Sequence, residues 1–188
     1  DRNLLTKLLL NQSLLAKRRG DASADEAAAQ AEYAHGLARV TRALELARAL
    51  GNRYDEAHCL GQTGTILRLL HSHADAGRVL RETLELGRAL EEPNVQAEAL
   101  MELGALHVSE GRVTDARQSL TEAIALARRI SARGVLAEAC ETLSQVLERT
   151  GDFAGALAAY KEFHAVRETE LAGSRKHAAA AAQLTAFP

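Results

Sequence analysis

The sequence predicts an all-α fold in which helical hairpins stack into a superhelix, with about four repeats and a long C-terminal helix. Three observations predict it. The 188 residues are rich in Ala, Leu, Glu and Arg and include two prolines and no tryptophan, a composition that favours helices over sheets. Three similar stretches begin at Ala57, Ala97 and Ala137, 40 residues apart. Each stretch divides at a turn into two segments whose apolar residues recur every three or four positions, as in paired amphipathic helices.

The first unit, residues 1–56, is predicted to be an irregular helical hairpin. Its first helix runs from Asn3 to Arg19, and its second helix runs from about Asp25 to Leu50. Relative to the later units it carries an insertion at residues 21–31, and the pattern does not distinguish a loop from further helical turns there. Leucines cover more than one face of the first helix, which predicts contact with upstream repeats or with another chain.

The next three units span residues 57–96, 97–136 and 137–172, and each is predicted to be a helical hairpin. Turn-forming residues separate the two helices of each unit and link each unit to the next. The turns within units lie at 71–73, 111–112 and 151–152, and those between units lie at 51–52, 92–94 and 131–134. Residues 173–188 are predicted to extend the last helix or to form a linker, because an alanine-rich helical pattern continues toward Pro188.

The middle repeat carries a specific pattern of residue types. It consists of Leu103-Gly104, His107, Gly111, Val113, Ala116, Leu120 and Ala123. This pattern resembles the tetratricopeptide repeat (TPR) family in its leucine-glycine pair, aromatic positions, turn glycine and packing residues. The resemblance implies a right-handed solenoid of TPR-like hairpins, in which the usual repeat of ~34 residues is lengthened. Small residues such as Gly104 let the paired helices approach, and large residues such as Leu120 fill the groove between them.

The last part of the chain shows a second resemblance. The stretch Tyr160-x-x-Phe163-His164-x-x-x-Glu168 resembles the helix by which TPR sensor regions of bacterial signalling proteins lead into an output domain, of GGDEF diguanylate cyclase or histidine kinase type. The resemblance implies that the chain is the sensory or regulatory region of a larger bacterial signalling protein. We expect the chemistry of such an output domain to lie outside these residues.

The overall charge argues against nucleic acid as a partner. The formal net charge is −2 and the sequence pI is about 6.4, whereas proteins that bind phosphate backbones usually carry a basic excess. No apolar run approaches the ~20 residues that a membrane-spanning helix needs, so we expect no membrane insertion and a cytoplasmic location. Cys59 and Cys140 are too few for a disulfide framework and are expected to be small core residues.

No pattern in the chain predicts catalysis. We find no phosphate loop, no glycine-rich strand-to-helix turn and no nucleophile elbow, and we expect the helical carboxylates to be solvated or paired with arginine. The histidines lack the spacing that places two zinc ligands on one helical face; the candidates are His58-Cys59, His71, His73 and His107. The sequence therefore predicts a non-enzymatic chain with no metal site and no cofactor.

The first helix of each hairpin in such a stack lines the concave face, so its exposed positions are the predicted binding site for a partner. Carrying the groove positions of the TPR family over to this sequence predicts sixteen residues, of which five are acidic and two are basic. They are His58, Gln62, Thr65, Arg68, Leu69, Glu98, Met101, Glu102, Ala105, Val108, Glu138, Glu141, Thr142, Gln145, Glu148 and Arg149. An acidic lining that also contains apolar residues predicts a basic or amphipathic protein or peptide ligand.

The leading hypothesis is thus a TPR scaffold that binds a protein or peptide, and the sequence leaves two other functions open. One is a structural role, in which the leucine-rich first helix or the alanine-rich last helix assembles a homodimer. The other is a quorum-type peptide receptor, which would hold a peptide backbone with amide side chains. Among the predicted groove residues, Gln62 and Gln145 carry an amide.

Overall fold

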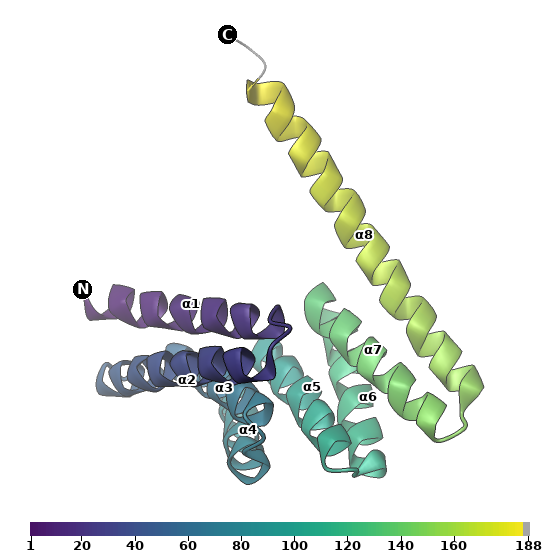
Figure 1. Ribbon diagram of the computed structural model, residues 1–188, viewed down its shortest axis with the longest axis horizontal. Coiled ribbons are helices and arrows are strands. Elements are labelled where there is room, and N and C mark those ends of the chain that lie inside the picture. The colour runs from purple at the N-terminus through teal and green to yellow at the C-terminus, as the bar shows by residue number, and fades with distance from the viewer. Residues whose placement is uncertain (186–188) are drawn as a thin grey trace.

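The computed structural model describes the backbone of residues 1–185 and the side chains of residues 1–169, 171 and 172. The predicted all-α superhelix is confirmed, since the described residues form eight helices and no strand (Figure 1). The helices are α1 (Arg2–Asp21), α2 (Glu26–Ala49), α3 (Arg53–Leu69), α4 (His73–Ala89), α5 (Pro93–Ser109), α6 (Val113–Ile130), α7 (Arg133–Arg149) and α8 (Phe153–Thr185). Pro188, toward which the sequence pattern continues, lies outside the described residues.

Six helices end at residues with left-handed backbone conformation, and these residues recur every 20 positions. They are Gly51, His71, Glu91, Gly111, Ser131 and Gly151. After each of them, the next amide donates to the carbonyl five residues back, as Ser72 N does to Leu67 O at 2.9 Å and Arg112 N does to His107 O at 2.8 Å. This Schellman arrangement satisfies carbonyls at the helix end and reverses the chain. One helix and one turn together occupy 20 residues, which accounts for the 40-residue repeat.

Both ends of the chain depart from this period. Position 31 lies inside α2, so residues 26–31 of the insertion are helical, and Asp25 caps the helix by accepting from Ala27 N at 3.1 Å. Position 171 is a leucine, and α8 runs through it over 33 residues. None of the helices in the described part of the chain is long and apolar enough to cross a membrane.

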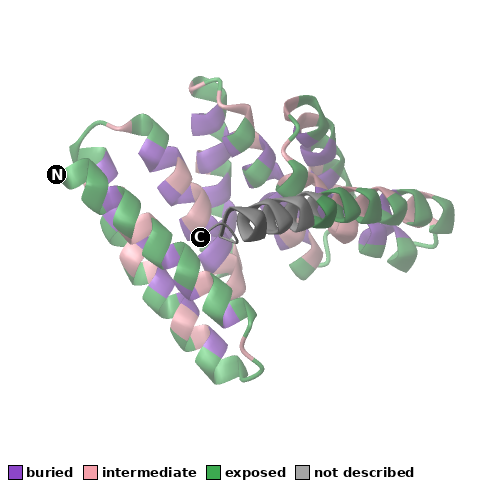
Figure 2. Ribbon diagram, turned by 90° about the horizontal axis from the view of Figure 1, so that it is seen from above, coloured by how far each residue is buried: buried purple, intermediate pink, exposed green. Residues whose placement is uncertain are grey.

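Small residues facing large ones hold the hairpins together. A Cβ atom added at Gly64 would lie 2.5 Å from Leu80 Cδ2, and one added at Gly104 would lie 2.6 Å from Leu120 Cγ. Both leucines are fully buried. Figure 2 shows that buried residues follow the faces along which neighbouring helices meet. The hairpins therefore depend on glycine at these two positions, as the sequence pattern predicts.

The stack curves because its first and second helices pack differently. The backbones of the first helices approach one another, α1 with α3, α3 with α5 and α5 with α7. Long side chains bridge the second helices: Arg48 of α2 reaches Glu82 of α4 with an N–O distance of 2.9 Å, and Arg128 of α6 pairs with Glu162 of α8. The first helices are therefore closer together and lie on the concave side. Beyond the stack, α8 continues as a single projecting helix (Figure 1).

Candidate functional site

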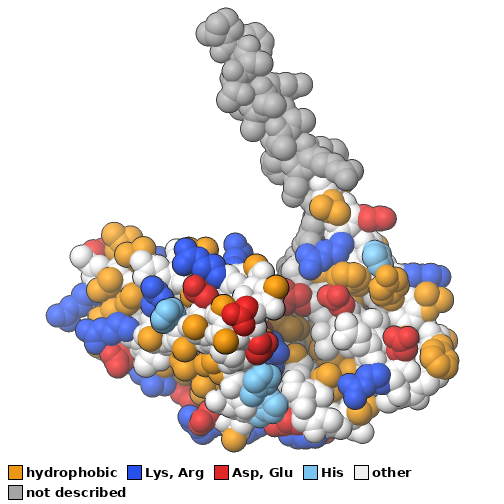
Figure 3. Space-filling view, in the orientation of Figure 1, with side chains coloured by type: hydrophobic (Ala, Val, Ile, Leu, Met, Phe, Trp, Pro, Cys, Tyr) orange, Lys and Arg blue, Asp and Glu red, His pale blue; other side chains and the backbone are white. Residues whose placement is uncertain are grey.

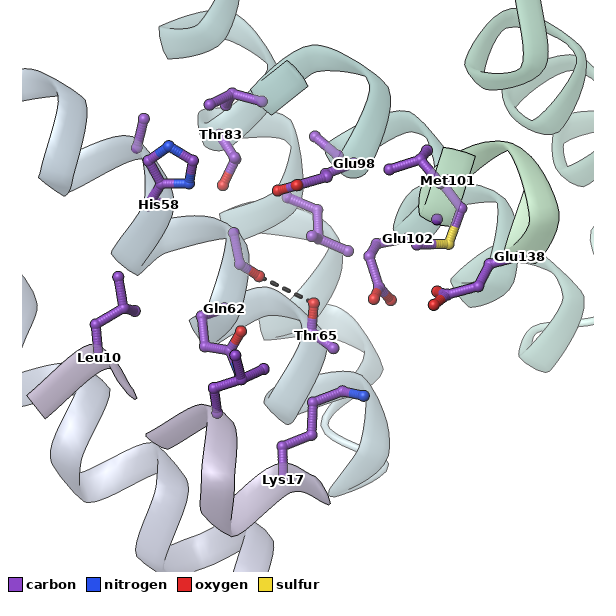
Figure 4. A pocket seen from close by; sticks show the side chains of 18 of the residues that line it. Leu10, Lys17, His58, Gln62, Thr65, Thr83, Glu98, Met101, Glu102 and Glu138 are labelled. Atoms are coloured by element: carbon purple, nitrogen blue, oxygen red, sulfur yellow. Dashed lines mark hydrogen bonds between the residues drawn. The ribbon is translucent and has the colours of Figure 1, made fainter. Parts of the chain in front are cut away.

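The concave side of the stack contains a hollow of about 420 Å³ between α1, α3, α5 and α7. In the space-filling view this face is hollowed near its middle, and acidic side chains gather beside the recess (Figure 3). The close view shows that Leu10 and Lys17 of α1, Gln62 of α3 and Glu138 of α7 border the same space (Figure 4). A hollow of this size falls in the range of small-ligand sites, roughly 300–1,000 Å³.

Seven of the sixteen groove residues predicted from the sequence line this hollow. They are His58, Gln62, Thr65, Glu98, Met101, Glu102 and Glu138. The other nine lie outside it: Arg68, Leu69, Ala105, Val108, Glu141, Thr142, Gln145, Glu148 and Arg149. The nine come from the middle and C-terminal parts of α3, α5 and α7. The hollow therefore takes up only part of the groove that the sequence predicts.

Three of the residues that we expected to be exposed in the groove are buried instead. Thr65, Met101 and Glu102 are each less than 10 % exposed. The close approach of the first helices on the concave side removes these positions from solvent. Glu102 is also paired, since its Oε2 accepts from Arg68 Nε at 2.9 Å. This ion pair links α3 to α5, so Arg68 and Glu102 serve the packing of the stack.

Sequence reasoning missed the whole contribution of α1 to the hollow. Leu10, Asn11, Leu14 and Lys17 form one wall of the hollow. The first unit does not follow the 40-residue register, so the groove positions of the later units could not be transferred to it. The available signal was the spread of leucines over more than one face of this helix, which pointed to a second contact surface but not to its place.

Three carboxylates give the hollow its charge. Glu98 and Glu138 are exposed at the rim, yet they stand on a concave face where surrounding protein atoms displace water. Desolvation is the main cause that raises the pKa of Glu98; the charges of Glu102 and Glu138 add to it, and His58 opposes it. Desolvation likewise raises the pKa of Glu138, with repulsion from Glu102 added and with Lys17, Arg167 and Arg68 opposing.

Polar side chains on α3 add hydrogen-bonding groups to the hollow. The Nε2 atom of Gln62 is buried and has no hydrogen-bond partner among the described residues. Thr65 Oγ1 donates to Gly61 O at 3.1 Å, which leaves its oxygen able to accept. Of the two amide residues that a quorum-type receptor would use, Gln62 borders the hollow and Gln145 does not.

The groups most suited to nucleophilic chemistry are inert in this environment. Cys59 and Cys140 are fully buried, and desolvation raises the pKa of each thiol to about 12. Both thiols therefore stay protonated near neutral pH, and the thiolate is the reactive form. Within the described residues, no group of three or more His, Cys, Asp or Glu side chains is placed to hold a metal ion.

Comparison with known proteins gives no match to a family model or to a curated protein. Solved structures do match. BtubC (BKLC) from P. vanneervenii aligns with a TM-score of 0.69 and 20% identity, over 90% of this chain and 66% of its own. The apo form of RapI aligns with a TM-score of 0.72 and 15% identity, over 90% and 58%. Aspartyl phosphate phosphatase F from Bacillus subtilis aligns with a TM-score of 0.76 and 15% identity, over 90% and 42%.

The chain has a TPR-like helical-repeat fold. At identities of 15–20%, the likeness to these structures concerns the fold alone. The chain spans 42–66% of the length of these three neighbours. The TPR-like stack thus provides a curved scaffold, and the hollow on its concave side is the candidate site.

Proposed function

We propose that this chain is a TPR-like scaffold that binds a protein or peptide in the hollow on its concave side. The observation that carries the proposal is the hollow itself, because five helices from separate parts of the chain (α1, α3, α4, α5 and α7) border about 420 Å³ of space. Seven residues at TPR groove positions border it. The likeness in fold to RapI and to the other helical-repeat proteins supports a scaffold role.

The lining favours an amphipathic or basic ligand. Leu14, Met101 and Val135 present apolar surface, while Glu98 and Glu138 present negative charge. Apolar contacts supply most of the affinity of a groove for a peptide, and opposite charge steers the encounter and fixes the orientation. A peptide with a basic residue next to an apolar one would satisfy both parts of the lining.

We also propose that the chain is the sensory or regulatory region of a larger bacterial signalling protein. The continuous helix α8 supports this role, since it leaves the stack and extends over 33 residues (Figure 1). It packs against α7, whose residue Glu138 borders the hollow. A ligand that moves α7 would therefore move α8, and an output domain of GGDEF or histidine kinase type attached to this helix would receive the change.

The proposed action is binding rather than catalysis. Both cysteine thiols have a pKa raised to about 12, and Glu102 is occupied by Arg68. The phosphatase named among the structural neighbours is 15% identical to this chain, and the alignment covers 42% of the phosphatase. The activity in its name is therefore stated of that protein and not of this chain. A scaffold role needs no group with catalytic reactivity.

Selection from a random peptide library displayed on phage tests the binding function. We expect enriched peptides that carry basic and apolar residues. Gly61→Leu should abolish their binding, because Gly61 borders the hollow and its added Cβ has room, 3.5 Å from Thr83 Cγ2. Ala125→Leu, at an exposed position of α6 outside the hollow, should leave binding unchanged. Peptides that bind the Gly61→Leu variant as tightly as the unmodified chain would place the site elsewhere.

A structural homodimer is the second candidate function, and the surface of α1 favours it. Leu4, Leu8 and Leu15 are 67%, 51% and 49% exposed on this helix. An exposed apolar helix face commonly marks an interface. Light scattering over about a hundredfold range of concentration tests this role. A dimer that dissociates in the Leu4→Glu/Leu8→Glu double variant would support the homodimer role. A monomer at every concentration would exclude it.

A further inference from the structure

We propose that the hollow binds a primary ammonium or guanidinium group at the end of an aliphatic chain, with Glu98 and Glu138 as its counter-ions and Lys17 as a nearby cation whose charge opposes its binding. This inference rests on the proposed binding function and adds the chemistry that the site selects. It also assigns a role to Lys17, a residue of α1 that belongs to no groove position of the repeats.

Two carboxylates in the hollow have no cationic partner in an ion pair among the described residues. Glu98 of α5 and Glu138 of α7 border the same space and take part in none of the ion pairs that the described residues form. The third carboxylate, Glu102, lies on α5 like Glu98 and is paired with Arg68. Desolvation is the main cause that raises the pKa values of Glu98 and Glu138, and repulsion from the charge of Glu102 adds to it for both groups. A cation placed between them would relieve that repulsion.

A cationic side chain of the protein, Lys17, already lies near these carboxylates. Lys17 projects from α1 toward the side of the hollow where Glu102 and Glu138 lie (Figure 4). Its positive charge opposes the rise in the pKa of Glu138. The ammonium group is nevertheless anchored elsewhere, because Lys17 Nζ lies 2.9 Å from Asp21 Oδ2 on the same helix. A ligand cation can therefore reach Glu98 and Glu138 while Lys17 keeps Asp21 as its partner.

The remainder of the lining suits an aliphatic stem. The apolar side chains that line the hollow include Leu10 and Leu14 of α1, Met101 of α5 and Val135 of α7. Methylene groups gain free energy from such contacts while the charged end reaches the carboxylates, as the side chains of lysine and arginine do at protein surfaces. Gln62, with its unpaired amide nitrogen, borders the same hollow and can bind a carbonyl group of the ligand.

Two sources can provide this chemistry: a lysine or arginine side chain within a peptide, and a free polyamine. The experiment uses one probe for each, a capped tetralysine peptide and spermidine. Met101 is the single methionine of the sequence and borders the hollow, so its ¹³C-labelled methyl group reports binding by NMR. Met101→Leu identifies the resonance. Binding of the peptide alone assigns the site to a side chain, binding of spermidine alone assigns it to a free polyamine, and either result supports the proposal.

The variants separate a cation site from general groove binding. We expect Glu98→Gln with Glu138→Gln to weaken probe binding by about tenfold or more, and Lys17→Met to strengthen it about threefold or more. Lys17→Arg should restore the affinity of the unmodified chain. Lys161→Met, at an exposed position on α8 away from the hollow, should leave the affinity unchanged. Circular dichroism shows that each variant remains folded.

Three results would overturn the inference: no saturable shift with either probe, equal affinity after the paired glutamate substitutions, or unchanged or weaker binding after Lys17→Met. A peptide in which every lysine is acetylated distinguishes this failure from failure of the proposed function. If the acetylated peptide binds as well as the charged one and Gly61→Leu blocks both, the hollow is a peptide site without cation selectivity. If Gly61→Leu blocks no ligand at all, the proposed function itself fails.

Discussion

Single residues control how closely the helices of this stack approach one another. Gly64 and Gly104 leave space that the buried side chains of Leu80 and Leu120 fill. The sequence predicted both pairs, because a small residue and a large residue recur at fixed positions in each unit. The same reasoning did not predict which of the groove positions are buried. Burial of Glu102, for example, depends on Arg68 reaching across from the neighbouring hairpin, and no local pattern contains that contact.

Substituting either glycine tests the packing at the residue scale. Alanine gains about 0.5–1 kcal/mol over glycine within a helix, but overpacking a core costs roughly 1–3 kcal/mol. Since an added Cβ would lie 2.5 Å or 2.6 Å from a fully buried leucine, we expect overpacking to win. Gly64→Ala and Gly104→Ala should each lower the free energy of unfolding by roughly 1–2 kcal/mol, measured by urea denaturation.

Gly134→Ala is the matched control for this prediction. Gly134 lies in the first turn of α7, and an added Cβ would meet no atom within 4 Å. This substitution should leave stability unchanged or raise it by a few tenths of a kcal/mol. A loss at Gly134 equal to that at Gly64 would show that close packing is not the cause.

The turns decide how the elements are arranged. A left-handed residue every 20 positions ends six helices, and a Schellman hydrogen bond follows each of them. Three of the six residues are glycine, and the other three are His71, Glu91 and Ser131. The sequence predicted these turns from glycine and from neighbouring turn formers. It did not predict the left-handed conformation of His71 or Glu91, since those residue types carry no strong turn signal.

The same turns allow a test at the element scale. A side chain in the left-handed conformation costs roughly 1–2 kcal/mol, and glycine avoids this cost. Glu91→Gly should therefore raise the free energy of unfolding by about 0.5–1 kcal/mol, after the greater flexibility of glycine in the unfolded chain is deducted. Gly111→Ala should lower it by about 1 kcal/mol. Thermal and urea unfolding measure both, and a gain for Gly111→Ala would contradict the assignment of the turn.

A tertiary contact holds α2, which contains residues 26–31 of the insertion in the first unit. Tyr33 is buried against Gly20, and its hydroxyl donates to Asp21 Oδ1 at 2.9 Å. Burial, followed by the carboxylate of Asp21, raises the pKa of Tyr33 to about 12, so the phenol remains a donor. This contact fastens the first half of α2 to the end of α1. The choice between a loop and a helix at residues 21–31 thus depended on a partner helix, which the local pattern does not show.

At the scale of the whole molecule, the curvature of the stack concentrates negative charge. Glu98 and Glu138 belong to different hairpins, and bending brings them to one hollow where both lose part of their hydration. Their pKa values are raised, so the folded protein binds more protons than the unfolded chain near and above the ordinary glutamate pKa of 4.5. Their contribution to stability is therefore lost as pH rises through the raised pKa values.

This charge predicts a stability profile that depends on pH. Glu98→Gln with Glu138→Gln should raise the melting temperature at pH 7, and the gain should shrink as pH falls toward 4.5. Because both side chains are exposed at the rim, we expect less than about 1 kcal/mol at pH 7. Calorimetry across this pH range measures the effect. A gain of equal size at both pH values would show that the two carboxylates are not electrostatically strained.

Glu162→Gln is a control of opposite sign. A hydrogen bond from Arg128 is the main cause that lowers the pKa of Glu162, so this carboxylate stabilises the folded state above the ordinary value of 4.5. The substitution should lower the melting temperature at pH 7, by about 1 kcal/mol or less in stability. The loss should fade as pH falls through the lowered pKa, where the native carboxyl becomes protonated.

Local patterns were sufficient to establish the helices, their pairing, the 40-residue repeat and the contacts between small and large residues, because all of these arise between positions close in the chain. The hollow has a different origin. Leu10 and Lys17 of α1 line the same hollow as Glu138 of α7, although more than a hundred residues separate them in the sequence. In addition, α1 does not follow the register of the repeat. Its place in the site follows from the curvature that the packing of all four hairpins produces, which is a property of the folded stack.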